Sequence, residues 1–385
     1  MFKTLKNVVR IGISGSYGGL NLGDEAILHS IVSQIRRSLP AEITVFSRNP
    51  ADTLRRHQID RAFAAREMTR LETRQEISNL DFFILGGGGI LYDAEVDAYL
   101  REVMIAHELS IPVMIYAVSV GPLTQSSSRK QAKEALNQAA IITVRDRQGH
   151  RLLEDIGVQQ SIHLTADPAL LLGEEELTDE ALQAEGINLG GKRLVGFSLR
   201  EPGPAAPDLD IEYYHNLIAN VADFMVHRLD ADIVMVPMEQ HNMDIQHSHA
   251  VVAKMKSASR ATILKREYSA GQILSLMKRF EFVVGMRLHS LIFAALQGIP
   301  FVPLPYSSKV TGFVEALEMN TEPLEQVNAG QLIAVIDRAW DFRAEMRHHL
   351  IQKIPGLKDL AKKNHQYLLD YFEQNHMEVV NRASS

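Results

Sequence analysis

Short apolar runs that alternate with amphipathic stretches constrain the fold of this chain more than any other feature. Six runs lie in the first part of the sequence, at residues 8–13, 43–46, 82–85, 113–118, 141–144 and 161–164. Five more lie at 194–199, 233–236, 262–264, 282–284 and 301–304. The runs are rich in Val and Ile and mostly lack polar alternation, which is typical of strands buried on both faces of a parallel sheet.

The intervening stretches are predicted to be helices. Residues 24–39 place Ile27, Ile31, Ile35 and Leu39 four positions apart, which gives one apolar stripe. Similar patterns occur at 94–109, 128–140, 211–229 and 270–279. Repeated strand–helix alternation predicts the α/β class, with parallel sheets and right-handed crossovers.

An acidic interruption separates the two series of runs. It starts at Gly173-Glu-Glu-Glu176, ends at Gly190-Gly-Lys192 and has no strand pattern. Because 385 residues exceed the usual size of one domain, we interpret it as a linker between two Rossmann-like domains, 1–175 and 190–325. Residues 326–385 are predicted to form a C-terminal helical tail, which carries the only tryptophan, Trp340.

Composition excludes several classes of protein. The chain has no cysteine, which rules out disulfides, thiolate nucleophiles and cysteine-ligated zinc. Its 40 Lys and Arg against 47 Asp and Glu give no basic excess, so we expect no nucleic-acid partner. The N-terminal residues lack the apolar core of a signal peptide, and no run of 18 apolar residues occurs. We therefore expect a cytoplasmic protein.

Two glycine-rich segments follow predicted strands, where ligands of doubly wound sheets bind. The first, from Gly12 to Glu25, has the spacing GxxGxxG and includes Asn21 and Asp24 as candidate substrate-binding residues. The alternative is that Asp24 and Glu25 only cap the following helix. The second is Gly86-Gly-Gly-Gly89 after the run 82–85, and Gly87, Gly88 and Gly89 are candidate site-lining residues. Four glycines let a ligand or another backbone come close, or form a hinge.

A third segment, Arg287-Leu-His289, opens a helix after the run 282–284. A helix N-terminus with a guanidinium can bind carboxylate or phosphate, and His289 is suited to acid/base chemistry. The alternative is a capping histidine and a surface ion pair. Arg145, Arg200 and Lys309 also follow predicted strands and are candidate substrate-binding cations, although each alone could be solvated or salt-bridged.

Two other chemistries are disfavoured. His241, Asp244, His247 and His249 form a cluster, but their spacing matches no metal motif. No GxSxG nucleophile elbow occurs. We expect no metal and no serine hydrolase triad.

An ordered set of motifs resembles the polysaccharide pyruvyl transferase family. The matching segments are Asn21-Leu-Gly-Asp-Glu25, Asp81-Phe-Phe-Ile-Leu-Gly-Gly-Gly-Gly89, Gly121-Pro122, Val144-Arg-Asp146, Ala166-Asp-Pro168, Gly285-Met-Arg-Leu-His289, Gly298-Ile-Pro300 and Tyr306-Ser-Ser-Lys309. They run from about residue 10 to residue 320, in the order found in the family. One departure is Gly149, where the family usually has serine, so no role is carried over to that position.

The resemblance implies a GT-B-like arrangement of the two domains, with the tail crossing back. It implies pyruvyl transfer from phosphoenolpyruvate, the only co-substrate expected, to a sugar hydroxyl pair in cell-surface or exopolysaccharide biosynthesis. Residues 190–325 would take phosphoenolpyruvate and residues 1–175 the acceptor. His289 and Arg287 would be catalytic, with Arg200 in the donor site and Lys309 associated with function.

Other interpretations stay open on the sequence. The chain could be a GT-B glycosyltransferase that uses a nucleotide sugar, a non-catalytic sugar- or nucleotide-binding homologue, or a family relative with shifted chemistry. A lipid-linked acceptor would bring the protein to the inner face of the membrane. Four tail lysines could then contact anionic lipid, although a solvated helix face is the favoured interpretation: Lys353, Lys358, Lys362 and Lys363.

Overall fold

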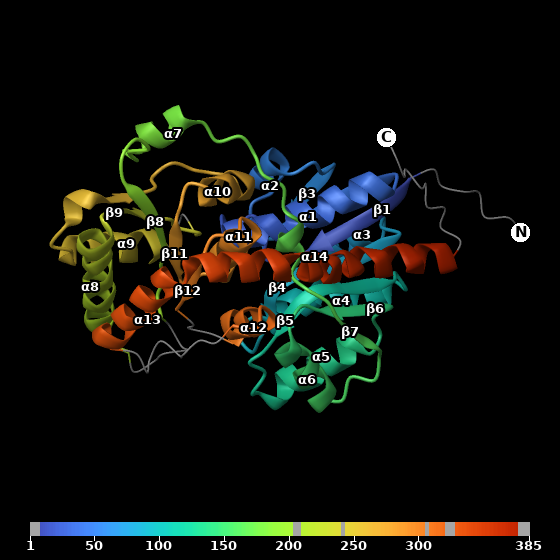
Figure 1. Ribbon diagram of the computed structural model, residues 1–385. Helices are drawn as coiled ribbons and strands as arrows, with labels where there is room; N and C mark the ends of the chain where they lie inside the picture. Colours follow the sequence, from blue (N-terminus) through green and yellow to red (C-terminus); the bar gives the residue numbers. More distant parts are fainter. Residues whose placement is uncertain (1–7, 203–208, 240–242, 305–307, 320–327, 376–385) are drawn as a thin grey trace, which may run out of the picture. The chain divides into compact units, whose positions relative to one another are not determined.

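Two parallel sheets, each in its own compact unit, organise the chain (Figure 1). The computed structural model describes residues 8–202, 209–239, 243–304, 308–319 and 328–375. Among these, the first unit contains 8–19, 24–172 and 358–375, and the second contains 20–23 and the described part of 173–357. A short segment near the N-terminus therefore groups with the second unit.

The first unit has a seven-stranded sheet in the order β3-β2-β1-β4-β5-β6-β7. All its neighbouring strands are parallel. The strands are β1 (Val9–Ser14), β2 (Ala41–Ser47), β3 (Arg61–Ala64), β4 (Phe82–Leu91), β5 (Val113–Val120), β6 (Ile141–Val144) and β7 (Ile162–Leu164). The strand order reverses between β1 and β4, so the loops at their carboxyl ends border the usual ligand crevice of such sheets.

Helices connect these strands as the apolar periodicity predicts. They are α1 (Leu22–Ser38), α2 (Pro50–Arg56), α3 (Arg70–Ile77), α4 (Val96–Glu108), α5 (Ser126–Leu136) and α6 (Arg147–Asp155), with a 3-10 turn at Pro168–Leu171. In α1 the stripe Ile27, Ile31 and Ile35 is fully buried, while Asp24 and Glu25 lie in the first turn. The amphipathic pattern thus positions the acidic first turn of α1 beside the loop after β1.

The second unit has a five-stranded parallel sheet in the order β10-β9-β8-β11-β12. Its strands are β8 (Arg193–Ser198), β9 (Ala231–Met235), β10 (Ala261–Ile263), β11 (Phe282–Gly285) and β12 (Phe301–Pro303). Its helices are α7 (Asp179–Ala184), α8 (Ile211–Leu229), α9 (Met243–Lys254), α10 (Ala270–Met277), α11 (Leu288–Leu296), α12 (Ser308–Ala316) and α13 (Ala329–Asp341), with a 3-10 turn at Ala258–Arg260. Here the order reverses between β8 and β11.

The long C-terminal helix α14 (Arg343–Gln374) contributes to both units, since its residues from Lys358 onward group with the first (Figure 1). That half buries Asn364 and Phe372 in the first unit. Phe372 packs edge-on against Phe82 of β4, with ring centroids 5.0 Å apart. None of the helices in the described ranges is long and apolar enough to cross a membrane.

The predicted fold class is confirmed, and each of the eleven predicted strands is present. Three details differ. Strand β3 was not predicted, and β4 continues through the four glycines to Leu91 instead of ending at Leu85. The acidic stretch predicted as a linker contains helix α7 and packs within the second unit, where Glu185 accepts hydrogen bonds from the backbone N–H groups of Lys265 and Arg266.

Candidate active site

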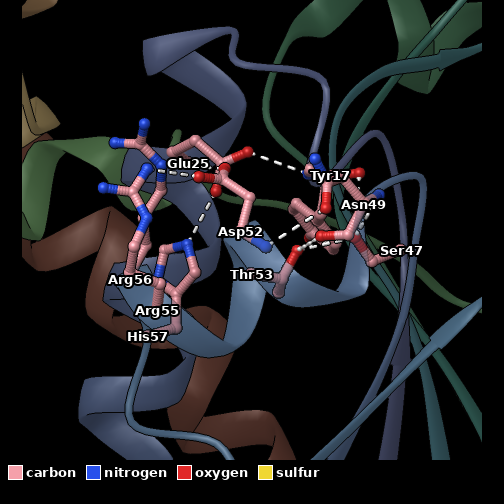
Figure 2. A network of polar contacts seen from close by, with 10 residues as sticks. Tyr17, Glu25, Ser47, Asn49, Asp52, Thr53, Arg55, Arg56 and His57 are labelled. Atoms are coloured by element: carbon pink, nitrogen blue, oxygen red, sulfur yellow. Dashed lines mark hydrogen bonds and ion pairs between the residues drawn. The ribbon is translucent and has the colours of Figure 1, made fainter. Parts of the chain in front are cut away.

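In the first unit, a buried carboxylate holds the loop after β1. Glu25 Oε1 accepts a hydrogen bond from the Gly18 backbone at 2.9 Å, and Oε2 lies 2.7 Å from His57 Nε2 (Figure 2). Gly18 has a positive φ of 72°, and a Cβ there would lie 2.3 Å from Ser47 Oγ. Glu25 therefore does more than cap α1: it fixes the backbone of a loop in which glycine is required at position 18.

The same loop is supported from the end of β2 (Figure 2). Ser47 Oγ lies 2.6 Å from Thr53 Oγ1 and accepts from the Asn49 backbone at 3.1 Å, while Asn49 caps α2. Asp52 in the first turn of α2 binds Arg55 and Arg56. Burial opposes ionisation of Asp52, but these two guanidinium groups prevail and lower its pKa. The end of β2 contacts the loop directly, since the Arg48 backbone donates to the Tyr17 carbonyl at 2.9 Å.

The four glycines of β4 allow α1 to approach the sheet closely. A Cβ on Gly87 would lie 2.2 Å from Ile27 Cγ2, and Gly87 and Gly88 have positive φ values of 38° and 101°. The carbonyl of Gly86 accepts a hydrogen bond from Tyr17 Oη at 2.8 Å. Of the three possibilities for this segment, the structure shows the close approach of other chain segments, and Gly88 lies beside the Asp24 carboxylate.

Arg145 is buried in an ion pair. Its Nη1 lies 2.5 Å from Asp167 Oδ2, with the two side chains 4% and 6% exposed, and its Nε donates to Ser119 Oγ at 2.6 Å. Two of the recurring motifs, Val-Arg-Asp and Ala-Asp-Pro, are therefore joined by this pair. Gly149 lies in the first turn of α6, where a Cβ would come within 3.1 Å of both Asp146 Oδ1 and the Val120 backbone nitrogen, so the missing serine has little room.

In the second unit, the segment Leu20–Gly23 contacts the Arg-Leu-His motif. The Leu22 backbone donates to the Met238 carbonyl at 2.8 Å, and Asn21 Oδ1 accepts from the Gly23 backbone at 3.0 Å. A Cβ on Gly23 would lie 1.9 Å from His289 Nδ1. The glycine of the Asn-Leu-Gly motif is therefore needed because the imidazole of His289 lies against its backbone.

Arg287, at the N-cap of α11, is held by two carboxylates. Its Nε lies 3.0 Å and its Nη2 2.5 Å from the two oxygens of Asp244, and Nη2 lies 2.6 Å from Glu239 Oε2. Asp244 is fully buried and also accepts from the Met238 and Glu239 backbones. Burial raises the pKa of Asp244, and Arg287 counteracts that rise. The alternative of a surface ion pair is thus wrong, because this pair is buried.

The other predicted cations follow strands of the second unit. Arg200 comes two residues after β8, and its Nε donates to the Glu201 carbonyl at 3.0 Å. Lys309 lies in the first turn of α12. Tyr306 and Ser307 of the same motif lie outside the described residues.

Each unit brings some of the predicted residues together. In the second unit, Asn21 bonds to the backbone of Gly23, Gly23 lies against His289, and Arg287 adjoins at the same helix start. In the first, Asp24 lies beside Gly88, while Arg145 is reached through Ser119, which pairs with Gly89 in the sheet.

The sequence interpretation missed the role of Asp244 as the partner of Arg287. Asp244 and His247 were considered only as part of a weak metal cluster. Within the described ranges, no group of three or more His, Cys, Asp or Glu side chains is arranged to hold a metal ion, and His241 lies outside them. The i, i+3 spacing of Asp244 and His247 is the signal in the sequence, because it places both side chains on one face of α9.

The comparison with family models decides the family. The model described as polysaccharide pyruvyl transferase matches residues 21–308. The chain belongs to the polysaccharide pyruvyl transferase family. The match covers residues 21–25 of the first glycine-rich segment, all of the second and the Arg-Leu-His motif, and it confirms the resemblance noted in the sequence. No curated protein sequence matches this family member.

Solved structures share the fold of this family member at low sequence identity. The Staphylococcus aureus MnaA–UDP structure is 11% identical, with a TM-score of 0.67, and the match covers 96% of this chain and 98% of that one. A putative UDP-N-acetylglucosamine 2-epimerase from Listeria monocytogenes is 13% identical, with a TM-score of 0.65 and coverage of 95% and 97%. A glycosyltransferase from Rickettsia africae is 13% identical, with a TM-score of 0.62 and coverage of 96% and 99%. These similarities confirm the GT-B-like fold class.

Proposed function

We propose that this family member transfers the pyruvyl group of phosphoenolpyruvate to two hydroxyls of a saccharide, forming a ketal. The observation that carries the proposal is the arrangement around the Arg-Leu-His motif of the family. It lies at the carboxyl end of β11, where Asp244 holds Arg287 and the backbone of Gly23 packs against His289. A fixed guanidinium and an imidazole two residues apart suit an anionic substrate that must also accept a proton.

The proposed reaction has two bond-forming steps. An acid protonates the methylene carbon of phosphoenolpyruvate, and the first acceptor hydroxyl attacks C2 and loses its proton to a base. The C2–O bond to phosphate then breaks, with its electron pair leaving on phosphate. The second hydroxyl closes the ketal, and its proton leaves with the inorganic phosphate. In this proposal His289 is the acid, and the protein needs only placed cations and one proton-transferring group.

The charges favour a shared role for the cations. Phosphoenolpyruvate carries a carboxylate and a phosphate, whereas the positive charge of Arg287 is already compensated by Asp244 and Glu239. We assign Arg200, which follows β8, and Lys309, in the first turn of α12, to bind the donor together with Arg287. The acceptor is assigned to the first unit, near Asp24 and Gly88, and phosphoenolpyruvate is the only co-substrate.

Phosphate release from phosphoenolpyruvate tests the proposal. The protein is screened with lipid-linked and nucleotide-linked saccharides, and His289→Gln and Arg200→Ala are assayed beside it. We expect each variant to lose at least about 100-fold in rate, the range typical of a lost acid/base or charge-stabilising group. The matched control is His249→Gln, an exposed histidine on α9, which keeps the wild-type rate. Near-wild-type turnover in His289→Gln would remove its assignment as the acid.

A nucleotide-sugar glycosyltransferase is the second candidate, because a similarly folded structure was solved with UDP. Saturable binding of a UDP- or GDP-sugar, with glycosyl transfer and no response to phosphoenolpyruvate, would replace the first proposal. Binding of either donor without turnover of any saccharide would instead indicate a non-catalytic homologue.

A location at the inner face of the membrane is a further part of the proposal, tied to a lipid-linked acceptor. The tail lysines give it little support, since Lys353 pairs with Glu318 and Lys362 pairs with Asp359. Sedimentation with vesicles of anionic phospholipid, with and without a lipid-linked saccharide, distinguishes binding through the tail lysines from binding through the acceptor. Pelleting only with the saccharide would point to acceptor-mediated contact.

A further inference from the structure

A buried histidine pair lies next to the Arg287–Asp244 pair and has no part in the reaction scheme above. His247 follows Asp244 by one turn of α9 and is 4% exposed. Its Nδ1 lies 2.8 Å from Nε2 of His215 on α8. Its Nε2 is buried and has no hydrogen-bond partner within the described part of the chain. A buried, unpaired ring nitrogen is costly, so a structure that retains one calls for an explanation.

Charged groups of both signs surround His247. Arg200, after β8, and Arg287, after β11, both act on it electrostatically, and Glu201 opposes them. The ring of Tyr214, also on α8, packs edge-on at 6.1 Å. Burial lowers the pKa of His247, and the two guanidinium groups lower it further, so the imidazole is neutral near pH 7.

His215 is neutral for related reasons. Burial lowers its pKa, followed by the charges of His247 and Lys254, while Glu212 opposes the shift. Each neutral imidazole carries one N–H. When His215 Nε2–H donates to His247 Nδ1, the proton of His247 must lie on Nε2. His247 Nε2–H is then a buried hydrogen-bond donor, and Arg200 and Arg287 also act on this histidine electrostatically. A neutral N–H donor with guanidinium groups is suited to binding an anion.

We propose that His247 Nε2–H donates a hydrogen bond to the phosphoryl group of the donor substrate, together with Arg200 and Arg287. His215 is the positioning residue, because its N–H fixes the tautomer of His247. That the anion belongs to phosphoenolpyruvate rests on the proposed function, whereas the phosphate subsite rests on the His215–His247 pair between α8 and α9 and on the buried Nε2 of His247. His289 keeps the acid role, and His247 binds the group that leaves.

Substitution of His247 separates binding from chemistry. His247→Leu removes the donor, and the KM for phosphoenolpyruvate rises about 10- to 100-fold, the usual effect of losing one hydrogen bond to a charged group, while kcat changes less. His247→Gln retains an N–H donor and recovers part of the affinity. The matched control is His249→Leu on the exposed side of the same helix, which keeps the wild-type KM.

Inorganic phosphate is the probe that does not depend on pyruvyl chemistry. Titration of the whole protein, with histidine ring nitrogens followed by 15N NMR, should show His247 protonated on Nε2 in the phosphate complex. His215→Phe should remove that tautomer preference, which a merely structural role would not do. His247→Leu should weaken phosphate binding at least tenfold.

Each outcome decides one of the two proposals. Unchanged phosphate affinity in folded His247→Leu overturns the subsite, whatever the activity with phosphoenolpyruvate. Weakened phosphate binding without turnover of phosphoenolpyruvate keeps the subsite and rejects the proposed reaction. Where His247→Leu fails to fold, His247→Gln and the NMR signal decide: wild-type affinity with no response of His247 to phosphate overturns the subsite.

Discussion

At the scale of single residues, Gly23 controls where His289 lies. A Cβ at position 23 would come 1.9 Å from His289 Nδ1, so Gly23→Ala must displace the imidazole. We expect phosphate release to fall at least about tenfold, because a shift of about 1 Å in a reacting group is costly. The control is Gly19→Ala, where a Cβ has only ordinary contacts. Equal rates in the two variants would contradict the proposed part of His289.

Asp244 is the second residue for which we predict the effect of substitution, here on the free energy of unfolding. Asp244→Asn removes the buried one of the two carboxylates that pair with Arg287, and we expect the free energy of unfolding to drop by about 3 kcal/mol. Denaturant unfolding measures it. Glu239→Gln should cost about 1 kcal/mol or less, because Glu239 is 22% exposed and Asp244 remains. A larger loss in Glu239→Gln than in Asp244→Asn would reverse this ranking.

The sequence identified the residue types of this region but not their partners. Arg287 and His289 stood out because they open a helix after an apolar run. The carboxylates that hold Arg287 come from a different βα unit, and their contact depends on the order β9-β8-β11 in the sheet. Pairing across non-sequential strands cannot be deduced from local patterns, so Asp244 went unrecognised.

At the scale of elements, Asn364 fastens the C-terminal half of α14 to the first unit. Its Oδ1 accepts from Thr143 Oγ1 at 2.6 Å and Thr165 Oγ1 at 2.7 Å, and its Nδ2 donates to the Ala166 carbonyl at 3.0 Å. Asn364→Leu removes these three buried hydrogen bonds and leaves the two hydroxyls with only their backbone partners at Ile115 and Val144, and we expect the free energy of unfolding to drop by about 2–4 kcal/mol.

Thermal and denaturant unfolding measure that loss, with Asn375→Leu as the control. Asn375 lies exposed just beyond the last turn of the same helix and should change stability by less than about 0.5 kcal/mol. A matching effect in both variants would show that Asn364 does not anchor the helix.

His365, the next residue on α14, makes stability depend on pH. It is buried against Ser38 at 2.7 Å, and burial lowers its pKa to about 4 from an ordinary value of about 6.5. Between those two pH values the unfolded chain binds a proton that the folded chain does not. Stability therefore falls as the pH drops through this window, by up to about 3 kcal/mol.

His365→Gln should flatten this part of the stability–pH curve, measured by urea unfolding from pH 7 to pH 4. His348→Gln, an exposed histidine of the same helix, should leave the curve unchanged. A wild-type slope in His365→Gln would assign the pH dependence to other groups.

Elements with strong periodicity were predictable, and the exceptions have physical causes. Strand β3 was missed because its four residues, Arg61–Ala64, include one large apolar side chain and none is buried. Strand β4 appeared to stop at Leu85 because glycine weakens strand propensity. Gly86, Gly88 and Gly89 are nevertheless paired with β5, and the approach of Ile27 explains why no larger residue occurs at Gly87.

At the scale of the whole molecule, the two parallel sheets followed from the alternation of apolar runs. Binding of phosphoenolpyruvate should protect one unit from hydrogen exchange more than the other. If the phosphate subsite belongs to the second unit, phosphoenolpyruvate at about 100 times its Kd should stabilise the protein by about 2.7 kcal/mol. Hydrogen exchange should then slow in residues 198–202, 244–248 and 286–290, and α3, in the first unit, provides the internal control. Protection confined to the first unit would contradict the proposed donor site.

The assignment of residues 20–23 and 358–375 has a consequence for how this protein could be divided. The chain passes between the units four times, after Gly19, after Gly23, after Leu172 and after Leu357. A cut at 172 would deprive the first unit of the helix that carries Asn364 and the second of the backbone that packs against His289. A single crossover therefore cannot exchange one unit for that of a homologue. Exchange of the first unit requires three stretches, 8–19, 24–172 and 358–375, to be replaced together.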